Sequence, residues 1–162
     1  MYYKGTLIAV KDMERAKRFY RDVLNLDVVC DFGANVSLTG GISLQTADTW
    51  ATFIRKTDKD IIYANNAGEL YFETDDIEGF MNKLSSFSDV VYLHPLYEHR
   101  WGQRVVRFYD FDGHIVEVGE SIAMVVKRFV SSGLSIEETA ERMGVDTSYV
   151  VSCLEQYREG LE

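Results

Sequence analysis

The chain has 162 residues, of which 46% are hydrophobic and 13% aromatic. A chain of this length can bury a core without disulfides or a structural metal. Its composition excludes a disordered tail or a collagen-like chain. The net charge of -9 repels phosphate backbones and anionic lipid, so we expect neutral or cationic small-molecule partners and neither nucleic acid nor membrane. The two cysteines form no CxxC pair, and the first residues lack a signal-peptide pattern. We therefore expect a reduced, cytoplasmic protein.

The first half of the chain is predicted to fold as β-α-β-β-β. A strand over Lys4–Val10 runs into Asp12, a good helix N-cap, and the apolar residues that follow recur on one helical face. Three strands then follow, over Asp27–Phe32, Val36–Leu38 and Ile42–Thr46.

The same order of elements returns after a long linker. A strand over Glu69–Thr74 is followed by the capping pair Asp75-Asp76 and a second amphipathic helix that begins at Ile77. Three further strands are predicted, over Val90–Tyr97, Arg104–Tyr109 and Ile115–Gly119, and Asp112-Gly113 supplies the last hairpin turn.

Two stretches can be aligned between these halves. Val10–Glu14 matches Thr74–Glu78, and Gly41 matches Gly113, each glycine preceding a strand. The repeat predicts an α+β domain over residues 1–120, built from two modules over about 3–47 and 68–120 whose sheets face one cleft.

These modules, the helix VKDMERAKRFYRDVL and the closing hairpin RFYDFDGHIVEVGE resemble the vicinal oxygen chelate superfamily. It comprises glyoxalase I, bleomycin-resistance proteins, fosfomycin-resistance enzymes and extradiol dioxygenases. The resemblance covers roughly residues 3–120. It implies a homodimer with an inter-module cleft for a small carbonyl compound or thiol adduct, and in some members a divalent-metal-dependent lyase or isomerase.

The resemblance also implies four metal-ligand slots, which hold Gly5, Gln45, Glu69 and Glu117 in this chain. Glycine has no side chain to coordinate a metal, so Gln45, Glu69 and Glu117 are the expected ligands, and the two glutamates the expected catalytic groups. In the alternative reading, an arginine inside the cleft pairs with Glu117 and makes it structural. Arg104 and Arg107 are three residues apart on one strand, so only one of them faces the cavity.

The loop between the predicted strands Val90–Tyr97 and Arg104–Tyr109 carries three candidate ligand-binding residues. We predict that His99, Arg100 and Trp101 contact a ligand at the mouth of the cleft. Ordinary packing is an equal alternative for Trp101. Trp50 is a further ligand-binding candidate, on a short helix expected in the linker over Ala47–Gly68. His94 is expected to be structural and His114 to face solvent.

Residues 121–162 are predicted to form a helical tail. The stripe from Ile122 to Phe129 gives one helix, the capping box at Ser135 opens a second, and a third spans Asp146–Tyr157 with Val150, Val151 and Leu154 inward. The pattern resembles a helix-turn-helix. Four basic residues stand against seven acidic ones in this segment, which favours a packing or dimerising role over DNA binding.

Three functions remain open at this point. The first is a glyoxalase-like enzyme with a divalent metal on Gln45, Glu69 and Glu117. The second is a metal-free binding protein of the bleomycin-resistance kind, in which an acidic, aromatic-lined groove takes up a cationic or planar molecule. The third and weakest is a ligand-sensing regulator that uses the tail.

Overall fold

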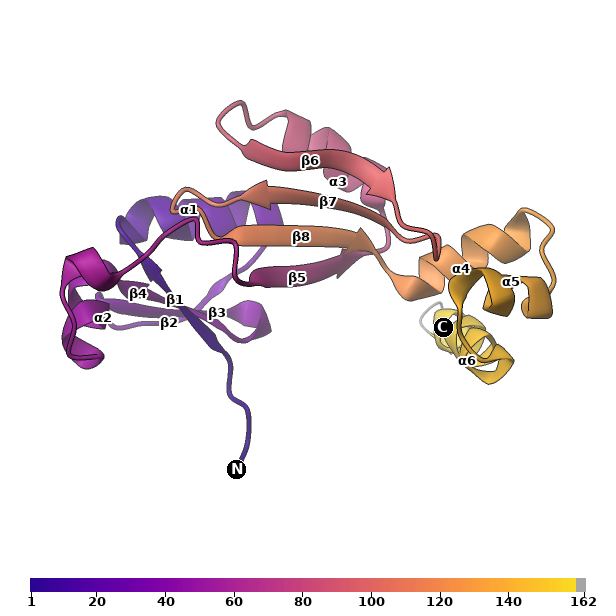
Figure 1. Cartoon of the computed structure of the whole chain (residues 1–162), viewed down its shortest axis with the longest axis horizontal. Helices are drawn as coiled ribbons and strands as arrows, with labels where there is room; N and C mark the ends of the chain where they lie inside the picture. The colour runs from indigo at the N-terminus through magenta and orange to yellow at the C-terminus, as the bar shows by residue number, and fades with distance from the viewer. Residues whose placement is uncertain (160–162) are drawn as a thin grey trace. The chain divides into compact units, whose positions relative to one another are not determined.

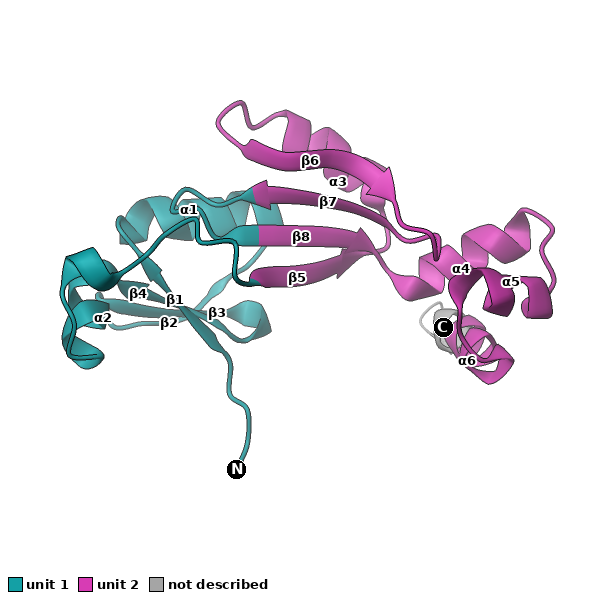
Figure 2. Ribbon diagram, in the orientation of Figure 1, with its two compact units in different colours: residues 1–68, 109–115 teal, residues 69–108, 116–162 magenta. Residues whose placement is uncertain are grey.

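The computed structural model describes the backbone of residues 1–159 and the side chains of residues 1–155. The chain forms two compact units (Figures 1 and 2). Unit 1 consists of residues 1–68 and 109–115, and unit 2 of residues 69–108 and the chain from residue 116 onward.

Unit 1 is built on a four-stranded sheet of order β1-β4-β3-β2. Its strands are β1 (Thr6–Val10), β2 (Val28–Asp31), β3 (Asn35–Leu38) and β4 (Ile42–Thr46). β1 runs parallel to β4, whereas β3 is antiparallel to both β4 and β2. All four predicted strands are confirmed, with ends that differ by at most two residues.

One face of this sheet is apolar and the other polar, because side chains alternate along each strand. Ile8, Leu44 and Val36 occupy equivalent positions in the register and form the apolar face. The neighbouring position places Asn35 beside Gln45 on the opposite face. The apolar face is buried by a helix that packs on it.

Helix α1 (Met13–Leu24) packs on this face of the sheet. As predicted, Asp12 is its N-cap and accepts a hydrogen bond from the Arg15 backbone N–H at 2.9 Å. Four side chains of one helical stripe are buried, namely Ala16, Phe19, Tyr20 and Val23. The chain then continues through the 3-10 turns η1 (Thr39–Gly41) and η2 (Asp58–Asp60), and through α2 (Ala47–Phe53), the predicted linker helix.

Unit 2 repeats this plan. Its sheet has the order β5-β8-β7-β6, with strands β5 (Glu69–Thr74), β6 (Val91–Glu98), β7 (Arg104–Tyr109) and β8 (Ile115–Glu120). In Figure 1 the arrows of β5 and β8 point the same way and that of β7 the opposite way. Helix α3 (Ile77–Ser85) follows the first strand, as α1 does in unit 1.

The two helices also begin in the same manner. Asp76 caps α3 by accepting a hydrogen bond from the Gly79 backbone N–H at 2.8 Å. Asp12 makes the matching bond three residues ahead in α1. The predicted βαβββ repeat is therefore confirmed in strand order and in the capping of its helices.

The turn between β7 and β8 is held by two buried aspartates of the motif Asp110-Phe-Asp112-Gly. Asp110 accepts hydrogen bonds from the Tyr20 hydroxyl at 2.7 Å, from the His114 ring at 2.8 Å and from two backbone N–H groups. Asp112 accepts from the backbone N–H of Lys11 at 3.3 Å. The expectation that His114 faces solvent is wrong, because its ring is half-buried against Asp110.

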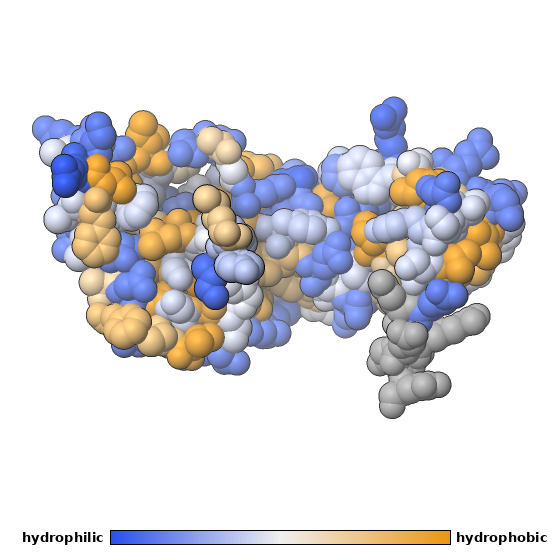
Figure 3. All heavy atoms as spheres, turned by 90° about the horizontal axis from the view of Figure 1, so that it is seen from below, coloured by the Kyte–Doolittle hydropathy of each residue, from blue (hydrophilic) through white to orange (hydrophobic). Residues whose placement is uncertain are grey.

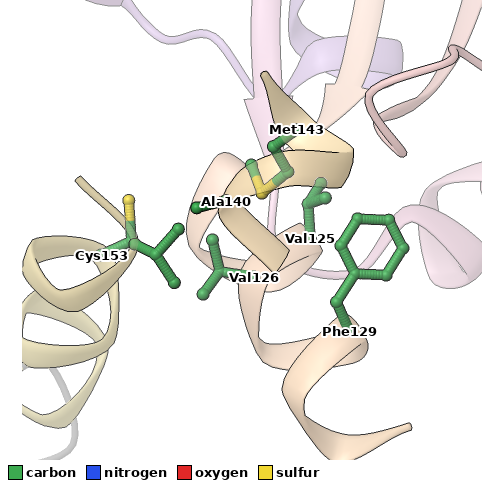
Figure 4. Packing of buried hydrophobic residues seen from close by; sticks show 7 residues of the cluster. Val125, Val126, Phe129, Ala140, Met143 and Cys153 are labelled. Atoms are coloured by element: carbon green, nitrogen blue, oxygen red, sulfur yellow. The ribbon is translucent and has the colours of Figure 1, made fainter. Parts of the chain in front are cut away.

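Three helices form the tail: α4 (Ile122–Ser131), α5 (Ile136–Met143) and α6 (Thr147–Glu159). Their buried side chains converge on one small core (Figure 4), which consists of Val125, Val126, Phe129, Ala140, Met143, Val150 and Cys153. The predicted capping box at Ser135 is confirmed. The inward position predicted for Val151 is wrong: it is exposed, and Cys153, three residues after Val150, takes the buried position.

No helix within residues 1–159 is both long enough and apolar enough to cross a bilayer. Hydrophobic side chains reach the surface at several places among hydrophilic ones on the face shown in Figure 3.

Candidate functional site

A cluster of charged groups in unit 2 lies on the face of the second sheet that α3 does not cover. Arg107 on β7 is its centre. Its Nε donates to Glu69 Oε2 at 2.8 Å, its Nη2 forms an ion pair with Glu117, and its Nη1 lies 3.3 Å from His94 Nε2. The structure therefore brings the two predicted glutamates together, on one guanidinium.

Strand alternation explains why these residues share a face. Arg107 and Arg104 are three positions apart on β7, so their side chains leave opposite sides of the sheet. Arg104 pairs with Glu78 of α3 and with Glu120 at the end of β8. The prediction that the two arginines point to opposite faces is confirmed, and Arg107 is the one that joins Glu69 and Glu117.

A second group of polar residues continues along the open face. The Tyr71 hydroxyl donates to Glu73 Oε1 at 2.6 Å and accepts from Gln103 Nε2 at 2.7 Å. Burial and the hydrogen bond to Glu73 raise the pKa of Tyr71 to about 12, so the phenol stays protonated. Gly119 lies beside Tyr71 and Gln103, and a Cβ there would meet the Gln103 amide at 2.9 Å.

The loop between β6 and β7 adds aromatic groups at the same end of the sheet. The rings of His99 and Trp101 stack with centroids 4.0 Å apart and planes inclined by 9°. Trp101 Nε1 approaches Gln103 Oε1 at 3.4 Å, and the Trp101 residue is 40% exposed. One face of the indole is covered by the imidazole.

The surroundings of His99 favour its neutral form. Burial, Arg107 and His94 together lower its pKa below the ordinary value. Its Nδ1 also makes a close hydrogen bond with the Tyr97 hydroxyl. Arg100, the third ligand candidate of this loop, is exposed.

The other predicted residues lie in unit 1. Gly5 has a φ of 147°, and a Cβ at this position would collide with the carbonyl oxygen of Gly41. Gln45 is buried and uses both ends of its amide, accepting from Asn35 Nδ2 at 2.8 Å and donating to Thr49 Oγ1 at 2.5 Å. Trp50 is half-buried on α2.

This donor set does not fit a divalent cation. Gly5 offers no side chain and has no room for one, and the amide oxygen of Gln45 already accepts a hydrogen bond. Glu69 and Glu117 are compensated by Arg107 instead of by a metal. Within the described part of the chain, no group of three or more His, Cys, Asp or Glu residues is arranged to hold a metal ion.

Sequence reasoning missed several residues of this face. Tyr71, Glu73 and Gln103 were not singled out, and His94 was expected to be structural only. The alternation of ELYFET does contain a signal, because it places Glu69, Tyr71 and Glu73 on one side of β5. Nothing in the sequence itself pairs this strand with Arg107.

The family follows from comparison with known domains. The glyoxalase-like domain family matches residues 3–123. The chain belongs to this family. The match includes both βαβββ modules, in agreement with the superfamily resemblance, and it ends at the start of α4. A comparison with curated proteins found no match.

Solved structures agree with this assignment. A protein of unknown function from Agrobacterium tumefaciens strain C58 is 36% identical, covers 75% of this chain and 95% of its own, and has a TM-score of 0.66. A member of the glyoxalase/bleomycin resistance protein/dioxygenase superfamily from Sphaerobacter thermophilus is 24% identical, covers 75% and 98%, and has a TM-score of 0.58. A lactoylglutathione lyase from Agrobacterium tumefaciens is 23% identical, covers 74% and 93%, and has a TM-score of 0.55. The last two likenesses show the fold alone.

Proposed function

We propose that this protein binds a small, planar organic cation without a metal ion, on the open face of its second sheet. The observation that carries the proposal is the ion-paired cluster of Glu69, Arg107 and Glu117. In a metal-dependent member of the family, a cation would have to balance these carboxylates. Here the guanidinium of Arg107 does so.

The charge and shape of the same face support this ligand class. Three carboxylates (Glu69, Glu73 and Glu117) stand on it near the guanidinium of Arg107, and the lowered pKa of His99 favours its neutral form. The excess of negative charge attracts a cation. Exposed aromatic rings at Tyr71 and Trp101 offer flat surfaces for stacking and for cation–π contact.

The competing function is the metal-dependent lyase or isomerase acting on a small carbonyl compound or thiol adduct. It needs the metal to displace Arg107 from Glu69 and Glu117. A metal ion bound to these two carboxylates would break the ion pairs that they already make with Arg107, and this loss disfavours metal binding. We therefore rank it second.

The proposal is tested by titrating the protein with proflavine, a planar aromatic cation, while tryptophan fluorescence is recorded with and without EDTA. We expect saturable quenching that the chelator does not change. Melting temperatures are measured in parallel with Mn²⁺, Ni²⁺, Zn²⁺ and Mg²⁺. A metal that raises the melting temperature, or quenching that EDTA abolishes, contradicts the proposal and favours the metal-dependent enzyme.

A pair of variants sharpens this test. Arg107→Gln leaves Glu69 and Glu117 without their shared cation, so it should gain Mn²⁺-dependent thermal stabilisation that the wild type lacks. Arg104→Gln is the matched control, because it removes an arginine of the same strand that also pairs with two glutamates on the opposite face. Equal responses of the two variants to Mn²⁺ would show that Arg107 does not stand in for a metal.

A further inference from the structure

The tail makes specific contacts with the loop that carries Trp101. Arg128 on α4 donates through Nη2 to the backbone carbonyl of Gly102, and through Nη1 to Glu98 at 3.3 Å. Arg142 on α5 also donates to Glu98, at 3.2 Å. Glu98 ends β6, so the tail holds both the start of the loop and the residue that follows Trp101.

A close packing contact reinforces these bonds. The ring of Phe129 lies against Gly102 so closely that a Cβ on this residue would overlap it. Gly102 also has a φ of 94°, a conformation that favours glycine. The guanidinium groups of Arg128 and Arg142 lie 5.0 and 4.7 Å from the centre of the Phe129 ring. The loop between β6 and β7 is therefore closely packed against α4.

The C-terminal end of the loop, at Gln103, is hydrogen-bonded as well. The buried Glu120 accepts from Arg104 Nη2 at 2.8 Å and from Arg128 Nη2 at 3.0 Å. Its carbonyl accepts from Gln103 Nε2 at 3.0 Å, the same amide group that bonds to Tyr71. Arg128 of the tail thus bonds both to the end of β8 and to the loop, and the backbone of the same Glu120 bonds to Gln103 of the open face.

We propose that the helical tail is part of the ligand site, with Arg128 and Phe129 as positioning residues that hold Trp101 against the ligand. This inference rests on the proposed function, and it extends the site beyond residues 3–123 that match the family. Because coupling between two sites is reciprocal, a ligand stacked on Trp101 also stabilises the docked tail.

The test uses the full chain with Trp50→Phe, so that Trp101 is the only tryptophan. We compare Arg128→Ala, Arg128→Lys and Arg142→Gln in this background. For each variant we measure the affinity for proflavine, the acrylamide quenching of Trp101 without ligand, and the melting temperature. We expect Arg128→Ala to weaken binding about tenfold and to make Trp101 more accessible to acrylamide. Arg128→Lys should restore most of both properties. Arg142→Gln, the matched control, leaves the bond to Gly102 intact and should change affinity less than twofold.

The outcomes separate this inference from the proposed function. If neither the wild type nor the Trp50→Phe parent binds proflavine, the proposed function fails. If only the wild type binds, Trp50 contributes to the site and the Arg128 variants are compared by affinity in the wild-type background. If the parent binds and Arg128→Ala binds equally well, with unchanged Trp101 accessibility, the inference about the tail is overturned and the proposed function stands. If Arg128→Ala does not fold, Phe129→Leu is judged by the same two readouts, since it keeps an apolar side chain but loses the ring against Gly102.

Discussion

Gly5 shows how a single residue decides what a site can hold. The superfamily resemblance implies a metal ligand at this position in metal-using members, and here the backbone lies against the carbonyl of Gly41. Any side chain there would need both a strained φ and a shift of the neighbouring segment. The missing ligand is thus a consequence of close backbone packing in unit 1.

We predict that Gly5→Ala lowers the free energy of unfolding by about 2–4 kcal/mol, because backbone strain and the overlap with Gly41 add together. Gly33→Ala is the control: Gly33 also has a positive φ, of 75°, but a Cβ added there would meet no other segment within 4 Å. It should cost only about 1–2 kcal/mol. Urea denaturation of both variants measures the difference, and equal losses would show that the Gly41 contact is unimportant.

At the level of elements, the turn between β7 and β8 explains the two aspartates in the closing hairpin RFYDFDGHIVEVGE. Asp110 and Asp112 organise the turn and join it to α1 and to the end of β1. Burial favours the neutral form of Asp110, but the bonds from His114 and Tyr20 outweigh it and lower the pKa. The aspartates of the motif are structural, and its glutamate, Glu117, is the member that reaches the open face.

We expect Asp110→Asn to destabilise the protein by about 2 kcal/mol, since the amide replaces a buried charge that accepts four hydrogen bonds. The matched control is Asp76→Asn at the exposed N-cap of α3, where asparagine caps as well as aspartate and the change should be near zero. Thermal unfolding of the two variants compares them. A neutral Asp110→Asn would argue that the turn does not depend on this carboxylate.

At the scale of the whole molecule, Glu120 connects the second sheet to the tail. Burial raises its pKa, but hydrogen bonds from Arg104 and Arg128 have the larger combined effect and leave the pKa below the ordinary value. A carboxyl group whose pKa is lowered on folding stabilises the folded state above its ordinary pKa of about 4.3. That contribution is lost as the pH falls through the lowered value.

Glu120→Gln should therefore be less stable than the wild type at pH 7, and the difference should shrink as the pH falls below about 4.3. Urea unfolding of both proteins between pH 7 and pH 3 provides the measurement. Glu137→Gln, an exposed glutamate in the first turn of α5, serves as the control with little pH-dependent difference. A constant gap between Glu120→Gln and wild type over this range would contradict the role given to the charge.

Residue order alone was sufficient to predict the local structure of this protein and its family. Capping residues such as Asp12, Asp76 and Ser135 act within three residues of their partners, and strand alternation and helical stripes repeat over a few positions. Such short-range interactions can be read directly along the chain. They were enough to predict both modules, the tail helices and the opposite orientations of Arg104 and Arg107.

The contents of the candidate site, by contrast, became visible only in the folded chain. Arg107 reaches Glu69 across 38 positions of the chain, and Arg128 reaches Gly102 across 26. Which arginine neutralises which carboxylate, and which loop receives a tail helix, depends on the pairing of strands and the docking of helices. Periodicity says which side a residue faces, but the partner it meets there is set by contacts between segments distant in the chain.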